Sequence, residues 1–362
     1  MTKLLLGITS HGFGHLAQSV PVISALRRQR PDIDLTVRTS LPHAVVEGRI
    51  APPFKLVATD QDFGLVMQSP FEVNRSATYA RYAALHGRYE KVVDELSRWI
   101  DHERFDCVIS NVSYIVLEAA HRVGVPSLAM SSLNWFDLFQ HYCASFERSI
   151  EIAKQIGNAY KRASVFCRLS PGMPMAGFVT TSIVESIAEQ GRSHWDELKL
   201  KYELPCSARI IVFAFGGISP ELPPPWDKRI AREHLVFGPA SWCGHDRPWR
   251  DPVTAEVPFV DIVASADMVI TKAGYGIVTE AAAAGVPVLF IRRGDWPEEL
   301  YLIEWLSHHV RHAYFEGLVE DLSLDEILSR CDELAAPRPA VRRSTGGEVQ
   351  IAAILRRLLD GN

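Results

Sequence analysis

Hydrophobic residues occur along the chain in short runs that alternate with longer stretches of helical periodicity. Each run is long enough for a strand buried on both faces of a sheet. We interpret as strands the runs Leu4–Thr9, Asp34–Thr39, Phe105–Ser110, Ser127–Ser131, Arg209–Phe215, His234–Phe237, Met268–Thr271 and Pro287–Ile291. The stretches between them predict helices at about Leu16–Arg28, Tyr79–Asp101, Ile115–Val123, Ile183–Tyr202, Tyr275–Ala284 and Glu348–Asp360. This alternation is typical of α/β folds with parallel sheets and helices on both faces.

The strands and helices fall into two series, which predicts two domains. A chain of 362 residues is long for one hydrophobic core and fits two domains of ordinary size. We expect a first Rossmann-like domain over residues 1–190 and a second over residues 205–340, with the boundary near 185–206. The amphipathic last helix, residues 347–362, can pack on either domain, including back on the first.

Composition and charge exclude several classes of function. The net charge is −5, whereas nucleic-acid-binding domains are basic, so we expect no nucleic acid partner. No apolar run approaches the roughly 18 residues of a membrane helix, although peripheral contact with a membrane surface stays open. The first residues form a strand pattern and not a signal peptide. The cysteines show no CxxC pair and no zinc spacing, which favours free thiols in a reducing, cytoplasmic setting; they are Cys107, Cys143, Cys167, Cys206, Cys243 and Cys331.

The stretch ADMVITKAGYGIVTEAAAAG, residues 266–285, carries the clearest chemical pattern. A buried strand runs into a turn with Gly274 and Gly276, where a helix begins. Free amides and the helix dipole make such a turn an anion site, and glycine lets a ligand approach the backbone. Glu280 follows about one and a half turns into the helix, where its carboxylate can reach a ribose. The alternative is a strand–turn–helix unit whose glycines serve close packing.

A second glycine-rich loop, GFGHLA, follows the first strand. It matches a loose GxGxxA of dinucleotide-binding proteins, but the second strand ends in Val37-Arg38-Thr39 without the acidic residue that holds a ribose. Arg38 would then bind a 2′-phosphate, which keeps an NADP oxidoreductase as an alternative. His11 and His15 flank these glycines, and a neutral imidazole there can take a proton from a hydroxyl. Their spacing does not choose between them.

Three further loops follow predicted strands. Gly216-Gly217 can bring amides to a phosphate or simply turn the chain. The loop Asp295–Glu299 places carboxylates beside Trp296, which suits sugar hydroxyls, although a solvated acidic loop is the commoner case. Asn134 and Trp135 can offer an amide and a stacking face to an acceptor, or serve as a helix cap and a core aromatic.

Taken together, these motifs resemble GT-B glycosyltransferases. They resemble in particular the glycosyltransferase-like N-terminal region of plant L-arabinokinase and its stand-alone bacterial relatives, and the similarity covers nearly the whole chain. The kinase part is absent, so the resemblance implies no sugar kinase activity. One segment, KAGYGIVTE, is more distantly similar to the donor motif of the peptidoglycan lipid-intermediate N-acetylglucosaminyltransferase. The motifs are SHGFGH, SSLNWFD, RLSPGMP, VFAFGG, KAGYGIVTEAAAAGVPVLFIRR, the following PEE and TGGEVQIAAIL.

The resemblance implies two Rossmann-like domains facing an interdomain cleft, with the acceptor on the first and the nucleotide sugar on the second. His15 corresponds to the family's base, and His11 is a competing assignment. The acceptor residues that we expect are Asn134, Trp135 and Asp137. The donor residues that we expect are Gly14, Gly217, Lys272, Gly274, Tyr275, Gly276, Glu280, Glu298 and Glu299.

Two positions depart from the family pattern. Glu298 and Glu299 stand where plant-type sugar transferases have an Asp-Gln pair that holds sugar hydroxyls. Asn111 stands where related enzymes have an aspartate that orients the histidine, and an amide cannot stabilise an imidazolium as a carboxylate does.

We therefore expect an inverting, metal-independent transfer of a hexosyl or N-acetylhexosaminyl group. The donor would be a nucleotide diphosphate sugar, UDP-linked in the first instance, which acts as co-substrate, and we expect no resident cofactor. The acceptor would be a hydroxyl of a small or lipid-linked molecule. A non-catalytic nucleotide-sugar binding or regulatory module is the alternative from another class.

Overall fold

The computed structural model describes residues 1–59, 63–177, 182–335 and 346–361. Within these ranges the chain divides into two compact units. The first comprises Met1–Gln68, Val73–Ile187 and the C-terminal helix, and the second comprises Ser69–Glu72 and residues 188–335. The four residues Ser69–Glu72 thus belong to the second unit although the chain on either side of them belongs to the first. The predicted end of the second domain at residue 340, and Thr345 of the TGGEVQIAAIL motif, lie outside the described residues.

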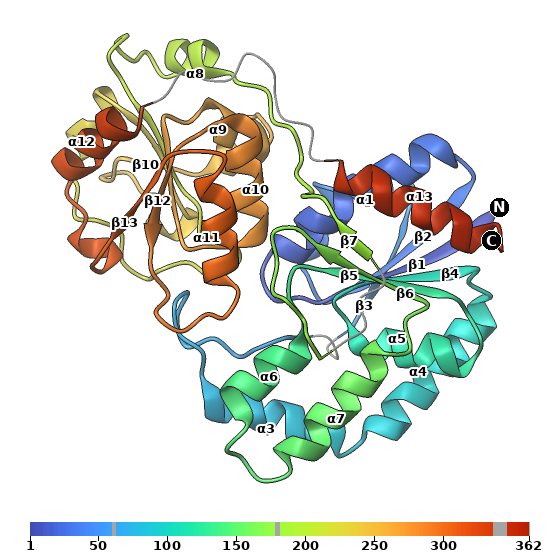
Figure 1. The fold of residues 1–362 in the computed structure, drawn as a ribbon. Helices are drawn as coiled ribbons and strands as arrows, with labels where there is room; N and C mark the ends of the chain where they lie inside the picture. The colour runs from blue at the N-terminus through green and yellow to red at the C-terminus, as the bar shows by residue number, and fades with distance from the viewer. Residues whose placement is uncertain (60–62, 178–181, 336–345, 362) are drawn as a thin grey trace. The chain divides into compact units, whose positions relative to one another are not determined.

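The first unit is built on a seven-stranded, all-parallel sheet with the order β3-β2-β1-β4-β5-β6-β7. Its helices lie on both faces, with α1 and α13 on one face and α4, α5 and α7 on the other (Figure 1). The strands are β1 (Thr2–Ile8), β2 (Ile33–Thr39), β3 (Lys55–Ala58), β4 (Cys107–Asn111), β5 (Ser127–Ser131), β6 (Val165–Leu169) and β7 (Ser182–Val184). The helices are α1 (Gly14–Gln29), α2 (His43–Glu47), α3 (Arg75–His86), α4 (Tyr89–Glu103), α5 (Tyr114–Arg122), α6 (Trp135–Cys143), α7 (Ser149–Tyr160) and α13 (Gly347–Leu359).

The register of this sheet brings three functional loops to one edge. Strand β1 pairs with β4 so that Ile8 lies opposite Asn111, the last residue of β4. Strand β5 pairs with β4 on its other side and ends at Ser131. Because all three strands run in parallel, the loops after β1, β4 and β5 leave the sheet side by side.

The C-terminal helix α13 packs on α1, the first helix of the chain. Its inward face is formed by Ile351, Ala352 and Leu355, which are fully buried. The helix therefore completes the core of the first unit on the side of the sheet opposite α5.

The second unit has a six-stranded, all-parallel sheet with the order β10-β9-β8-β11-β12-β13. The strands are β8 (Ile210–Phe213), β9 (Leu235–Phe237), β10 (Trp249–Arg250), β11 (Met268–Thr271), β12 (Val288–Ile291) and β13 (His312–Phe315). The α-helices are α8 (Trp195–Lys201), α9 (Phe259–Ser265), α10 (Tyr275–Ala284), α11 (Glu299–Ser307) and α12 (Leu324–Leu334), and short 3₁₀ turns occur at Lys228–Arg232, Ala240–Trp242, Pro252–Ala255 and Val319–Asp321.

Two hydrophobic clusters cover the two faces of the second sheet. Strand residues that alternate along β8 and β11 point to opposite faces, as a period of two requires. One cluster, which includes Ile262 of α9 and Val269, lies on one face. The other packs Trp242 and Trp249 together with Ile327 of α12. Both faces of the sheet are therefore buried, which explains the unbroken apolar runs of its strands.

Two helix predictions are wrong. The single helix predicted at Tyr79–Asp101 is two helices, α3 and α4, because the first ends at Gly87, which takes the C-cap position. The helix predicted at Ile183–Tyr202 begins as strand β7, since Ser182–Val184 pairs with β6. The rest of that stretch is irregular up to α8, and a Cβ at Gly191 would lie 2.1 Å from Val260 O. The segment is therefore irregular there, because Gly191 packs directly against the backbone of Val260.

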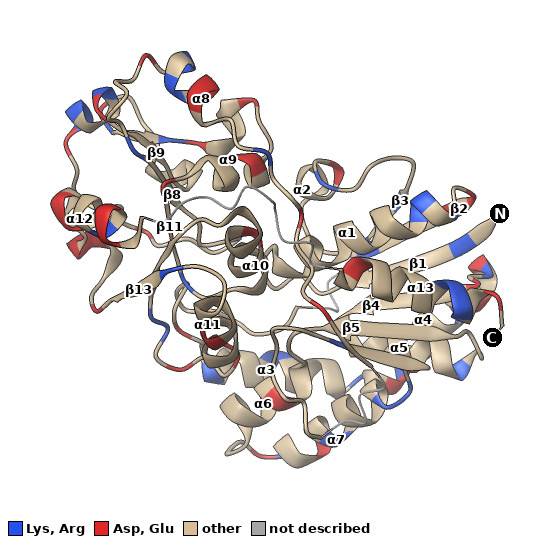
Figure 2. Cartoon of the chain, turned by 45° about the horizontal axis from the view of Figure 1, so that its top comes forward, with Lys and Arg blue, Asp and Glu red and all other residues tan. Residues whose placement is uncertain are grey.

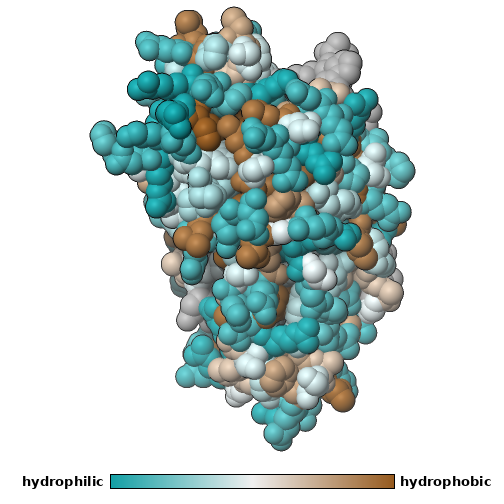
Figure 3. Space-filling view, turned by 90° about the vertical axis from the view of Figure 1, so that its left-hand side faces the viewer, coloured by the Kyte–Doolittle hydropathy of each residue, from teal (hydrophilic) through white to brown (hydrophobic). Residues whose placement is uncertain are grey.

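The charged side chains of the described residues do not give the surface a field of a single sign. Lys and Arg are interspersed with Asp and Glu over the helices of each unit (Figure 2). On the face drawn in Figure 3, hydrophobic side chains lie scattered among hydrophilic ones. No helix of the described residues is long and apolar enough to cross a membrane, and the six cysteines are free thiols.

Candidate functional site

The loop after β1 delivers His15 to the carboxyl edge of the first sheet. Helix α1 begins at Gly14, and His15 lies in its first turn with 5% of its surface exposed. Its Nδ1 lies 3.0 Å from Oδ1 of Asn111, at the end of the neighbouring strand β4. The register of β1 and β4 therefore produces the contact between two residues that are 96 positions apart.

A chain of amide hydrogen bonds fixes the direction of this contact. Asn111 Nδ2 donates to Gln18 Oε1 at 3.0 Å, and Gln18 Nε2 donates to Ser132 Oγ at 2.9 Å. Since the amide nitrogen of Asn111 is used for Gln18, its oxygen faces His15 and must accept from Nδ1–H. The neutral imidazole then carries its lone pair on Nε2.

Burial keeps this imidazole neutral. It lowers the pKa of His15 to about 4, because an imidazolium would lose its hydration, and the hydrogen bond to Asn111 opposes this shift only in part. A neutral Nε2 is the form that accepts a proton.

His11 is held differently. The amide of Leu65 donates to its Nδ1 at 3.3 Å, so the proton of the neutral ring is on Nε2. Its ring lies edge-on to Trp135, with 5.3 Å between centroids. Gly64, with φ of +71°, allows this approach, since a Cβ there would lie 2.7 Å from the Trp135 ring and 2.8 Å from His11 Cβ. His11 thus presents a donor where His15 presents an acceptor.

The predicted acceptor residues have local structural roles. Asn134 is fully buried and caps α6, with its side chain accepting from the Asp137 amide at 2.8 Å and donating to the Asp137 carboxylate at 2.7 Å. Trp135 is 1% exposed and donates from Nε1 to Thr9 Oγ1 at 3.3 Å. The geometry gives Asn134 and Trp135 no free face for a ligand, and their acceptor role stays a prediction.

In the second unit the predicted anion turn has the expected form. Gly274 is the N-cap of α10 and, as a glycine, makes no side-chain cap hydrogen bond to the first amides of the helix. No atom lies within 4 Å of a Cβ built at Gly274 or at Gly14 of the first unit, so the space before both is open. Helix α10 ends before Gly285, as predicted.

The loops after β8, β11 and β12 share one edge of the second sheet, since β11 lies between the other two strands. Gly217, in the loop after β8, is exposed, and its neighbour Gly216 has φ of +75°. Tyr275 and Gly276, at the start of α10, are buried. The backbone is therefore accessible at Gly274 and at Gly217 of the neighbouring loop, whereas the side chain of Tyr275 is buried.

Charged residues surround this edge. Glu280 is 4% exposed in α10. Glu298 accepts from Trp296 Nε1 at 3.3 Å, and Glu299 accepts from the Arg293 amide at 3.2 Å. Burial raises the pKa of Glu299. Lys272 is half-buried, and burial followed by the charge of Arg293 lowers its pKa to about 6.

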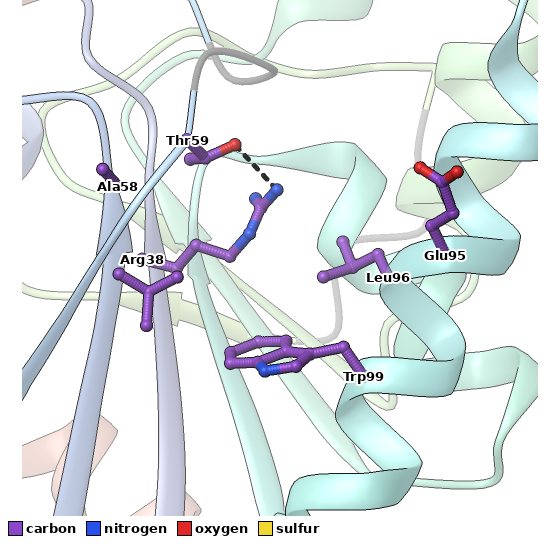
Figure 4. A pocket seen from close by; sticks show the side chains of 7 residues that line it. Arg38, Ala58, Thr59, Glu95, Leu96 and Trp99 are labelled. Atoms are coloured by element: carbon purple, nitrogen blue, oxygen red, sulfur yellow. Dashed lines mark hydrogen bonds between the residues drawn. The ribbon is translucent and has the colours of Figure 1, made fainter.

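Arg38 lies near the end of β2, and its side chain extends towards α4. Its guanidinium donates to Thr59 Oγ1 at 2.7 Å and lines a cavity of 320 Å³ with Leu96 and Trp99 of α4 (Figure 4). This position under α4 gives no support to a 2′-phosphate role. Among the described residues, no group of three or more His, Cys, Asp or Glu is arranged to hold a metal ion.

No protein-family model matches the chain. A curated relative is L-arabinokinase of Arabidopsis thaliana, which is 25% identical over 356 residues, or 94% of this chain. The chain spans about a third, 33%, of the length of that relative.

Solved structures match the whole chain. The calicheamicin glycosyltransferase CalG4 superposes with a TM-score of 0.61 at 15% identity, covering 99% of this chain and 98% of its own. UGT89C1 of Arabidopsis thaliana, solved with UDP, gives 0.57 at 13% identity, covering 100% and 98%. A Listeria monocytogenes protein named as a UDP-N-acetylglucosamine 2-epimerase gives 0.59 at 14% identity, covering 99% and 97%.

The chain has the GT-B fold. At these identities the likeness establishes the fold alone. The fold predicted from the motifs is confirmed.

Sequence reasoning missed three polar residues. Gln18 and Ser132 complete the hydrogen-bond chain behind His15, and Arg293 lies beside Lys272. A signal existed for Gln18, which is a polar residue one turn after His15 on a helix face that is otherwise apolar. No sequence signal connects Ser132 or Arg293 to the loops they join in space.

Proposed function

We propose that the protein is a glycosyltransferase that moves a hexosyl or N-acetylhexosaminyl group from a nucleotide diphosphate, UDP in the first instance, to a hydroxyl acceptor. The observation that carries this proposal is the His15–Asn111 pair, a buried neutral imidazole with its Nε2 lone pair available, in one unit of a GT-B fold. The second unit supports it with an uncapped helix N-terminus at Gly274 and a buried carboxylate, Glu280. The names of UDP-dependent proteins among the structural neighbours favour UDP.

The proposed reaction is a single displacement at the anomeric carbon. The acceptor oxygen bonds to this carbon while its proton passes to His15 Nε2. The bond from the carbon to the phosphate oxygen breaks, and its electron pair leaves with the nucleoside diphosphate. One displacement inverts the anomeric configuration. The amides at Gly274 and Gly217 stabilise the charge that develops on the leaving diphosphate, so the proposal needs no metal ion.

The donor would be held by the second unit. Glu280 would accept hydrogen bonds from the ribose hydroxyls, at the distance from the turn that the helix sets. Glu298 and Glu299 would accept from hydroxyls of the sugar.

Replacement of His15 tests the base. His15→Ala should lower kcat by about 10²- to 10⁴-fold, the usual contribution of a general base. His11→Ala should retain most of the activity, because its Nε2 carries the proton. Transfer would be followed as nucleoside diphosphate release, after a thermal-shift panel of UDP-, GDP-, dTDP- and ADP-sugars has identified the donor. Unchanged rates in both variants would show that neither histidine is the base.

A second candidate is a nucleotide-sugar binding or regulatory module without turnover. Asn111 favours it, since an amide gives the imidazolium less support than a carboxylate. This alternative predicts that UDP-sugar binding depends on Glu280 while no acceptor produces release of the nucleotide.

A further inference from the structure

A hairpin from the first half of the chain ends on the second unit. Met67 and Val73 form an isolated antiparallel bridge, and the residues Ser69–Glu72 between them are part of the second unit. We call Ser69–Glu72 the hairpin tip. Within the tip the Ser69 amide donates to Glu72 O at 3.3 Å, and the Phe71 amide donates to Ser69 Oγ at 3.2 Å. The tip therefore has a defined shape of its own.

The tip contacts the second unit through one ring and one carbonyl oxygen. Phe71 packs edge-on against Phe215, with ring centroids 6.0 Å apart, at the margin of the tryptophan cluster. Pro70 O accepts from Lys272 Nζ at 3.1 Å and from Arg293 Nη2 and Nε at 3.3 and 3.4 Å. One neutral oxygen thus accepts from two basic side chains, one in the loop after β11 and one in the loop after β12.

This arrangement has an electrostatic cost. Lys272 is half-buried beside the guanidinium of Arg293, and burial, followed by the charge of Arg293, lowers its pKa to about 6, so at neutral pH most of it is the neutral amine. Anchoring a carbonyl requires one donor, and the guanidinium alone would supply it. A second basic side chain at the same oxygen is therefore unexplained by anchoring.

An anion at this place would favour the charged form of Lys272 and offset its repulsion from Arg293. An ammonium has three N–H donors and a guanidinium has five, which is more than the hydrogen bonds to Pro70 O require. Hydrogen bonds from such cations to phosphate oxygens are charge-assisted and strong. Lys272 also lies two residues before Gly274, so the pair adjoins the open turn.

We propose that Lys272 and Arg293 form a diphosphate clamp that the hairpin tip assembles. Pro70 holds the two basic side chains together beside the turn, and Phe71 keeps Pro70 in place through Phe215. Arg293 is a donor-binding residue in this proposal, whereas Pro70 and Phe71 are positioning residues that do not touch the nucleotide. The inference rests on the proposed nucleotide-diphosphate donor and adds to it a segment from the opposite half of the sequence.

Calorimetric titration of the full chain with UDP, UMP and uridine tests the clamp. Phe71→Ala should weaken UDP binding about tenfold, UMP binding less, and uridine binding not at all. The loss of affinity should increase with the number of phosphate groups, because the clamp contacts only the phosphates. Arg293→Ala should also weaken the binding of UDP most, of UMP less and of uridine not at all. Arg293→Lys should recover part of the affinity for UDP. Gln68→Ala, an exposed residue outside the tip, is the matched control and should bind all three ligands as the wild type does.

Hydrogen exchange on the wild-type protein gives an answer that needs no variant. UDP should slow exchange at the amides of Ser69, Phe71 and Glu72, since a clamp with its anion bound holds Pro70 more firmly. Faster exchange with UDP would mean that the diphosphate displaces Pro70, and it would overturn the proposal. Equal losses for UDP and uridine in Phe71→Ala would also overturn it, by showing general damage. If the wild type binds UDP and Phe71→Ala binds it equally well, the clamp fails while the proposed function stands. If the wild type binds none of the nucleoside diphosphates, both fail.

Discussion

His15 and Asn111 define the chemistry of the first unit at the scale of single residues. Burial holds the imidazole pKa near 4 against the opposing effect of the hydrogen bond to Asn111, so the ring stays neutral over the physiological range. A base of low pKa is available at all times but is weak, whereas a carboxylate partner would make it stronger. The side chain at position 111, at the end of β4, therefore determines the basicity of His15.

The variant Asn111→Asp makes this relation measurable. A carboxylate beside Nδ1 favours the imidazolium, so the pKa of His15 should rise from about 4 towards or above its ordinary value of about 6.5. Because the base must be neutral, the acid limb of the pH profile of kcat/KM should move to higher pH by the same amount. The wild type should show a flat profile between about pH 5.5 and 8, since its base loses its proton well below that range.

Titration of the His15 ring by NMR in both proteins provides the control for the kinetic result. A shifted ring pKa with an unshifted pH profile would remove His15 from the role of base. His11→Ala introduced into the same background should leave the position of the acid limb unchanged.

At the scale of elements, the sequence predicted strands better than helices. Strands such as Met268–Thr271 are buried on both faces, so their apolar runs are continuous and bounded by turn residues. The stretch at residues 79–101 was interpreted as one helix, whereas α3 ends at His86 and α4 begins at Tyr89, a break too short for the hydrophobic pattern to show. The irregular segment before α8 depends on the approach of Gly191 to Val260, a contact about 70 residues away in sequence that no local pattern contains.

The residues of the candidate site were likewise predictable from the sequence only in part. The turn at Gly274 and the loop at His15 were predictable, because each is written in consecutive residues. The chain from His15 through Asn111 and Gln18 to Ser132, and the meeting of Arg293 with Lys272, depend on strand order, which a single sequence does not contain. The capping role of Asn134 was predictable as an alternative, and its burial decided the geometry.

The role of the turn before α10 in ligand binding can be tested separately from its effect on stability. Gly274 has φ −143° and ψ 142°, a conformation that alanine adopts freely, and a Cβ there would meet no atom within 4 Å. Gly274→Ala should therefore leave the melting temperature unchanged. The same methyl group would stand where a diphosphate approaches the amides, so UDP affinity should fall about tenfold or more. Calorimetry with UDP and a thermal melt of the free protein measure the two effects.

Gly216→Ala is the contrasting variant for this test. Its φ of +75° disfavours any side chain, so stability should fall by about 1 kcal/mol even without a ligand. A loss of stability in Gly274→Ala similar to that of Gly216→Ala would mean that the turn has a packing role, which is the alternative interpretation of its glycines.

At the scale of the whole molecule, the chain consists of two units with separate cores, and the first contains both ends of the chain. Helix α13 belongs to that core through residues such as Leu355, which is fully buried, while the proposed donor residues lie in the second unit. Each unit buries its own sheet on both faces, so each can unfold as a cooperative step. A single free energy of unfolding is then not defined for the chain, and the two steps should respond to different changes.

Leu355→Ala should act on one step and UDP on the other. Removal of a fully buried leucine costs about 2–5 kcal/mol, so the step that belongs to the first unit should occur at a lower temperature. A ligand of the second unit stabilises that unit according to its concentration relative to Kd, by about 2.7 kcal/mol at a hundredfold excess over Kd. In scanning calorimetry, UDP should therefore raise one transition in the wild type and raise the same transition by the same amount in Leu355→Ala. Arg356→Ala, the exposed neighbour on α13, should change neither transition. If Leu355→Ala also removes the response to UDP, the two cores are not independent, and the donor site depends on the packing of α13 against α1.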